Sequence, residues 1–114
     1  MDMYDSRVVF CAASAYDKKY YLNPQFDGLP QGVKEDLQIM CVLFTEDVGG
    51  IVSLYFDEEG NLQIETDAAE EDILYDEIGS ALKVKQMRTE KRDLLEGLEM
   101  YYQIVWRQGD DRCF

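Results

Sequence analysis

The chain has 114 residues, a formal net charge of -13 and no histidine. This length lies near the commonest size of a single domain, and 46 % hydrophobic residues are too many for a disordered acidic tail. Residues 1–114 are therefore expected to form one folded domain. The negative charge disfavours nucleic acid as a partner, and the lack of histidine excludes catalytic triads built on that residue.

The sequence predicts a cytoplasmic protein with neither a signal peptide nor a membrane span. The N-terminus carries two acids before its first base, Arg7, and no long apolar stretch follows. The cysteines, Cys11, Cys41 and Cys113, form no C-x-x-C pair. Two of them, Cys11 and Cys41, lie within apolar runs, where thiols act as small hydrophobes. A reducing compartment is therefore expected.

Four strands in two hairpins are predicted. Residues 8–13 are apolar and strand-like, and after a polar break residues 19–22 resume that composition, as in a hairpin. Residues 52–56 and 62–66 both alternate apolar and polar side chains, and Gly60 between them can supply a positive φ. The second hairpin should therefore have one core face and one wet face.

A helix is predicted between the two hairpins. Pro30 can occupy a first helical turn, and apolar residues then recur at spacings of three and four until Gly49 ends the pattern. Residues 37–44 hold one polar residue in eight, so this segment should be buried on most sides. A buried strand is the alternative for the same residues.

A second helix is predicted to begin near residue 68, because Asp67 and Glu70 have the spacing of a capping box. Apolar residues follow at helical spacing: Ile73, Leu74, Ile78, Ala81 and Leu82. A continuous helix over residues 68–107 would be about 60 Å long, whereas the radius of gyration expected for such a domain is about 13 Å. Either the chain folds back near residues 88–93, or a second subunit covers the overhang.

Together these elements predict an α+β domain. An antiparallel sheet of two hairpins should pack against a buried central helix and a long C-terminal helix or helical hairpin. The charge is polarised along this domain, since residues 20–82 contain fifteen Asp and Glu against the single base Lys34, and residues 83–92 contain five bases. A contact between that basic run and the acidic body is expected.

No catalytic, cofactor-binding or metal site is predicted. Asp72 and Asp76 would share a helix face, and hard cations bind such oxygen clusters, but solvated acids at a helix N-terminus are the preferred interpretation. Gly49 and Gly50 follow a helix and precede a strand, which is the reverse of the order in phosphate-binding loops.

The alternative is a small enzyme or ligand-binding domain. It would use carboxylates such as Glu46 or Asp76 and tyrosines such as Tyr55 or Tyr75, gathered around a deep pocket. The sequence favours a non-enzymatic role, because no such residues form a recognisable motif.

Four segments of the chain carry a resemblance to a known family. They read KYYLNP at 19–24, CVLFTEDVGG at 41–50, LYDEIGS at 74–80 and LEMYY at 98–102. In these the chain resembles an uncharacterised family of small acidic proteins from clostridia, over nearly its whole length. The resemblance implies a standalone bacterial protein and brings no activity, cofactor or functional residues.

The leading hypothesis is therefore a non-enzymatic interaction or regulatory module of the bacterial cytosol, acting as a homodimer. A second copy of the chain, or another protein, is the expected partner, with no nucleic acid, membrane or cofactor involved. The candidate core or interface residues, together with the candidate electrostatic contacts, are Lys83, Arg88, Arg92, Leu94, Leu98, Tyr101, Val105 and Trp106.

Overall fold

The structure, a computed structural model, describes residues 8–107, and the side chains of residues 8–104. Its strands are β1 (Val8–Ser14), β2 (Lys19–Leu22), β3 (Ile51–Phe56) and β4 (Leu62–Asp67), and its α-helices are α1 (Gln31–Val48), α2 (Glu77–Glu90) and α3 (Arg92–Tyr101). A 3₁₀ turn at Pro24–Phe26 precedes α1, and a π-helical turn at Tyr102–Arg107 follows α3. The predicted α+β class is confirmed.

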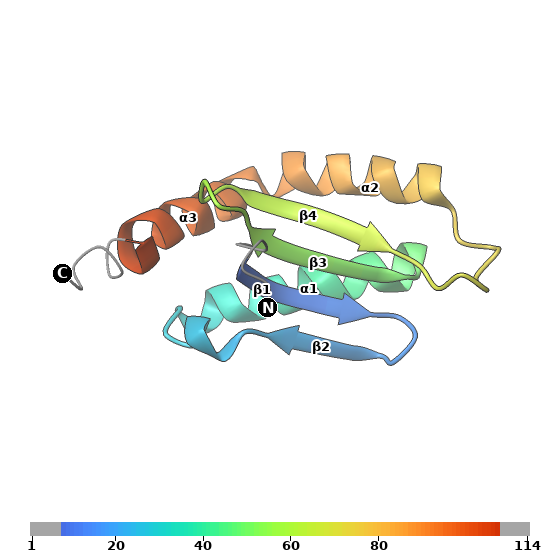
Figure 1. Ribbon diagram of the computed structural model, residues 1–114, viewed down its shortest axis with the longest axis horizontal. Helices are drawn as coiled ribbons and strands as arrows, with labels where there is room; N and C mark the ends of the chain where they lie inside the picture. Colours follow the sequence, from blue (N-terminus) through green and yellow to red (C-terminus); the bar gives the residue numbers. More distant parts are fainter. Residues whose placement is uncertain (1–7, 108–114) are drawn as a thin grey trace.

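The four strands form one antiparallel sheet in the order β2-β1-β3-β4. Both predicted hairpins are confirmed, and they are joined by the pairing of β1 with β3. The register of that pair shifts between Val9 and Cys11, so the successive residues Phe10 and Cys11 are both buried. Figure 1 shows α1 behind β1 and β3, and α2 running beside β4.

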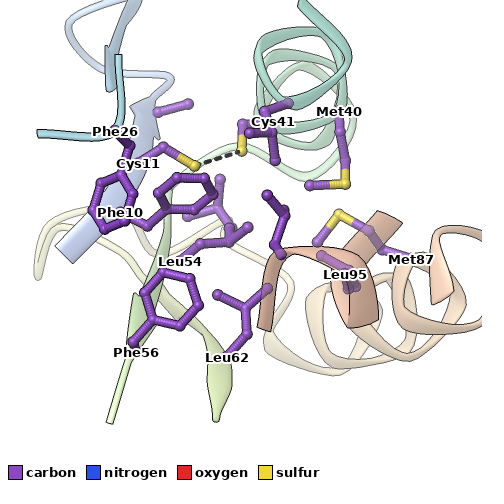
Figure 2. Packing of buried hydrophobic residues seen from close by; sticks show 14 of the residues in the cluster. Phe10, Cys11, Phe26, Met40, Cys41, Leu54, Phe56, Leu62, Met87 and Leu95 are labelled. Carbon is purple, nitrogen blue, oxygen red and sulfur yellow. Dashed lines mark hydrogen bonds between the residues drawn. The ribbon is translucent and has the colours of Figure 1, made fainter. Parts of the chain in front are cut away.

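The core lies between the sheet and the helices. Cys11, Leu54 and Phe56 from the sheet pack in one cluster with residues of α1 such as Leu37 and Cys41. In Figure 2 the thiols of Cys11 and Cys41 face each other across this layer, and their sulfur atoms are 3.9 Å apart. At the opposite end of the cluster the rings of Phe56 and Tyr102 stack with centroids 4.1 Å apart. The C-terminal turn is thereby tied to the sheet.

Helix α1 forms where it is predicted, and the alternative of a buried strand is excluded. The prediction that residues 37–44 are buried on most sides is wrong, because Ile39 and Leu43 are more than half exposed. The helix starts directly after Pro30 and ends before Gly49, whose φ is +78°. The Gly49 N–H donates to the carbonyl of Thr45 at 2.8 Å, which satisfies one of the terminal carbonyls.

The prediction that the second helix begins near residue 68 is wrong. Helix α2 begins at Glu77, and its N-cap is Asp76, whose Oδ1 accepts the N–H of Gly79 at 2.9 Å. The segment before α2 is bonded to the Tyr16 hydroxyl, which accepts the Ala69 N–H at 3.0 Å and donates to Asp72 Oδ2 at 2.6 Å. These bonds hold residues 68–76 as turns against the β1–β2 connection.

The C-terminal helical region breaks at Lys91, within residues 88–93, but the fold-back predicted there does not occur. Lys91 has φ -110° and ψ 26°, which are not helical values, and it separates α2 from α3. In Figure 1, α3 continues away from α2 and does not return alongside it. The described region is consequently elongated, with extents of 50 × 33 × 22 Å.

Candidate functional site: the outer face of the helical layer

The apolar residues proposed for the interface lie in the core of the chain. Leu98 is buried, and Leu94 and Tyr101 pack against the same cluster. Of the two roles predicted for them, core or interface, Leu94, Leu98 and Tyr101 therefore have the core role. The side chains of Val105 and Trp106 lie outside the described residues.

Two of the basic candidates are engaged within the chain. Lys83 Nζ lies 2.6 Å from Asp47 Oδ2, which joins α2 to α1 and confirms that the basic run contacts the acidic body. This hydrogen bond raises the pKa of Lys83 above its usual value, so the side chain stays cationic. Arg88 Nη2 donates to the carbonyl of Leu62 at 3.4 Å. Arg92 is exposed beside Glu96 and Glu99.

A different set of apolar side chains is left on the surface, and the sequence reasoning missed it. Ile39 and Leu43 on α1, and Ile78 and Leu82 on α2, each expose more than half of their surface. In both helices these residues are four apart, so each pair forms one stripe that points away from the sheet. We call these four residues the apolar strip.

The helical spacing from Ile73 to Leu82 predicts a buried stripe, but the structure buries a different face of α2. Ser80 and Met87 are buried and Val84 is partly buried, whereas Ile78 and Leu82 lie on the far side. Val84 and Met87 could have identified the buried face, because they are the apolar residues of the otherwise polar segment 83–92 and lie three apart on one face of the helix.

A groove of about 450 Å³ runs between α1 and α2, beside the apolar strip. Its apolar lining is Met40, Leu43, Phe44 and Met87. Methionine side chains are flexible and polarizable, so such a lining adapts to the shape of an apolar partner. Figure 2 shows Met40 and Met87 entering the core from α1 and α2, which form the two walls of this groove.

The groove is lined by the acids Glu46 and Asp47 from α1, and by Lys83, Glu90 and Lys91 from α2 and its C-cap; the two helices as wholes differ more in charge. The exposed acids of α1 are Glu35, Asp36, Glu46 and Asp47, and the bases of α2 and its C-terminal residue are Lys83, Lys85, Arg88 and Lys91. Glu77 and Glu90 are the acids on the α2 side. The outer face of the helical layer therefore presents exposed apolar side chains on two helices, of which α1 is acidic and α2 is the more basic.

The residues considered for enzyme or metal chemistry do not converge. Asp76 caps α2, Asp72 accepts a hydrogen bond from the Tyr16 hydroxyl, and the Tyr75 hydroxyl donates to Ser80 Oγ at 2.6 Å. Glu46 lies at the end of α1, whereas Tyr55 lies on the opposite side of the sheet from the helices. Among the described residues, no group of three or more His, Cys, Asp and Glu could hold a metal ion.

The sequence of residues 7–110 matches the model of a family of unknown function, DUF6145. The chain belongs to this family. Comparisons with curated proteins and with solved structures found no match. Within residues 8–107, no helix is both long enough and apolar enough to cross a membrane. Membership of DUF6145 brings no activity with it, so the role of the helical layer has to be argued from its own residues.

Proposed function

We propose that the chain is a non-enzymatic protein-interaction module of the bacterial cytosol, and that it forms a homodimer through the outer face of α1 and α2. The apolar strip carries this proposal. Soluble monomers rarely expose contiguous large apolar side chains, and such patches mark interaction sites. Ile39, Leu43, Ile78 and Leu82 are more than half exposed in the single chain, and a partner over them would remove this apolar surface from water.

The charges beside the strip favour a second copy of the chain as the partner. In a two-fold symmetric dimer, the acidic α1 of one copy can lie over the basic α2 of its partner, and symmetry repeats the contact. A surface that carries an acidic helix and a more basic helix, each with exposed apolar side chains, can be complementary to itself. The strip would then supply the affinity, and the charges would set the register.

The net charge of -13 makes this local complementarity necessary. Two copies repel each other at long range, so association depends on short-range contacts that bring unlike charges together. Among the exposed charges named above for the two helices, Asp36 and Glu46 on α1 and Lys85 and Lys91 at α2 make no side-chain hydrogen bond or ion pair within the described region. We expect these side chains to make the electrostatic contacts between the two copies, a role that the sequence suggested for the basic run 83–92.

Sedimentation equilibrium over a range of protein concentrations tests the proposal. The wild-type chain should sediment as a dimer, and Leu43→Glu should sediment as a monomer with an unchanged circular dichroism spectrum. Val9→Glu is the matched control, because Val9 is 44 % exposed on the face of the sheet away from the helices, and this variant should remain dimeric. A monomeric wild-type protein at both low and high salt would refute the dimer. A dimeric Leu43→Glu with a monomeric Val9→Glu would refute the choice of surface.

A further inference from the structure

Two thiols meet in the core between the sheet and α1. Cys11 on β1 and Cys41 on α1 are both fully buried, and their sulfur atoms are 3.9 Å apart although the residues are 30 positions apart in the chain. Figure 2 shows the two side chains pointing at each other. The sulfur–sulfur bond of a disulfide is about 2.0 Å long, so the two atoms need to approach by only about 2 Å to bond.

The side chain of Tyr20, on β2, lies beside this pair of thiols. Its hydroxyl oxygen is buried next to Cys11 but makes no hydrogen bond of good geometry within the described residues. Burial raises the pKa of Tyr20, and the neighbouring Cys11 and Cys41 raise it further. A buried polar group without a hydrogen bond costs free energy, so the Tyr20 hydroxyl gains little by staying in place.

Tyr20 also stands between the thiols and the solvent. A pocket of about 490 Å³ opens over β2 and α1, and Ala13, Tyr20 and Val42 are part of its lining. Strand β2 has four residues and lies at the edge of the sheet, where β1 is its one neighbour. Short edge strands with exposed backbone hydrogen bonds open locally at low cost. Displacement of the Tyr20 ring would therefore extend this pocket to the thiols.

We propose that Cys11 and Cys41 form an intramolecular disulfide when a peroxide enters through this pocket, and that Tyr20 limits its access. The proposal does not depend on the homodimer. First, the Cys11 sulfur attacks an oxygen of hydrogen peroxide, so that an S–O bond forms, the O–O bond breaks and water leaves with the thiol proton. Then the Cys41 sulfur attacks the Cys11 sulfur: the S–S bond forms, the S–O bond breaks and the Cys41 proton leaves in a second water molecule. The two thiols lose two electrons, and the peroxide is reduced.

The protonation of Cys41 sets the order of these steps. Its hydrogen bond with Cys11, together with burial, raises the pKa of Cys41, so this thiol keeps its proton at neutral pH. The thiolate is the reactive form of cysteine, which makes Cys41 a poor site for the first attack. Cys11 is therefore oxidised first, and the reaction stays slow while Tyr20 is in place. The disulfide would tie β1 to α1, and a reducing cytosol would reverse it.

Peroxide treatment of the folded Cys113→Ser chain tests the disulfide. After catalase removes the peroxide, the chain is unfolded in the presence of iodoacetamide and weighed by mass spectrometry. The untreated chain should take up two alkyl groups and the treated chain none, and a digest of the treated chain should contain the Cys11 peptide linked to the Cys41 peptide. Two alkylated thiols after treatment, or oxidised cysteines without the linked peptide, would overturn the proposal.

A matched pair of substitutions on β2 tests the role of Tyr20. Tyr20→Thr and Tyr21→Thr both keep a residue suited to a strand, but Tyr21 is 50 % exposed on the other face of β2. Tyr20→Thr should speed disulfide formation at least about tenfold, whereas Tyr21→Thr should leave its rate near that of the wild type. Tyr20→Phe, which keeps the ring, should also remain slow. Equal acceleration by Tyr20→Thr and Tyr21→Thr, or a fast Tyr20→Phe, would overturn the control of access by the Tyr20 ring.

Discussion

The substitution Leu82→Ala separates the stability of the chain from its self-association. Leu82 is 62 % exposed in the single chain, so its truncation should change the free energy of unfolding of the monomer by less than about 1 kcal/mol. In a dimer joined by the apolar strip, the exposed part of the side chain becomes buried. Full burial of a leucine contributes about 1.5–3 kcal/mol, so more than half of that, about 1–2 kcal/mol, is lost at each Leu82.

Two-fold symmetry places Leu82 in the interface twice. The loss per dimer is therefore about 2–4 kcal/mol, which corresponds to a rise of roughly 30-fold to 800-fold in the dissociation constant. Sedimentation equilibrium measures this constant, and urea unfolding at a concentration where only monomer is present measures stability. Leu37→Ala, at a fully buried position of α1, is the contrasting variant and should cost about 2–5 kcal/mol of stability. A Leu82→Ala protein with an unchanged dissociation constant would refute the reasoning.

Three further substitutions test the local structure. Gly50→Ala should lower the free energy of unfolding, measured in urea, by about 2–4 kcal/mol, because Gly50 has φ +71° and an added Cβ would lie 2.6 Å from the Asp67 carbonyl oxygen. Gly49→Ala is the control: Gly49 has φ +78° but open space around it, so the loss should be only about 1 kcal/mol. Equal losses in the two variants would argue against the close contact at Gly50. Asp76→Ala should lower the free energy of unfolding by about 1 kcal/mol because the α2 cap is lost, whereas Asp76→Asn should keep most of the stability that the cap provides. An equal loss of stability in both variants would argue against the cap. Asp57 accepts the N–H groups of Asn61 and Glu59 and the amide of Gln63, and these bonds lower its pKa. Its contribution to stability is present above the unfolded value of about 4 and is lost as pH falls through the lower folded pKa, so the gap in stability between wild type and Asp57→Asn should shrink in acid; a gap independent of pH would contradict this.

The elements that the sequence predicts well are those fixed by local chemistry. Val52, Leu54 and Phe56 alternate with polar residues because one face of β3 is buried, and that pattern alone defines the second hairpin. The glycine that ends α1 acts within a single turn, and its position could be read directly. The bulge near Phe10 could not be predicted in this way, because a shift of register depends on the partner strand as well as on β1.

The features that could not be predicted depend on contacts between distant residues. Asp67 and Glu70 have the spacing of a capping box, but residues 68–76 form turns whose Ala69 N–H is bonded to the Tyr16 hydroxyl, 53 residues away. Which face of α2 is buried is likewise decided by tertiary packing, because Ser80 is buried while Ile78 is exposed. Sequence periodicity therefore could not identify the exposed apolar residues, because Ile78 and Leu82 have the spacing of a buried stripe and residues 37–44 were expected to be buried on most sides.

A charge-exchange experiment tests the self-complementary dimer most directly. One variant carries Glu35→Lys with Glu46→Lys on α1, and the other carries Lys85→Glu with Lys91→Glu at α2 and its C-terminus. Each variant alone would place like charges opposite each other at both symmetric contacts, whereas a mixture pairs the basic α1 of one with the acidic α2 of the other. Sedimentation equilibrium should therefore show both variants weakened when alone and a heterodimer restored on mixing. A mixture that associates no better than the two variants alone would contradict the proposed dimer.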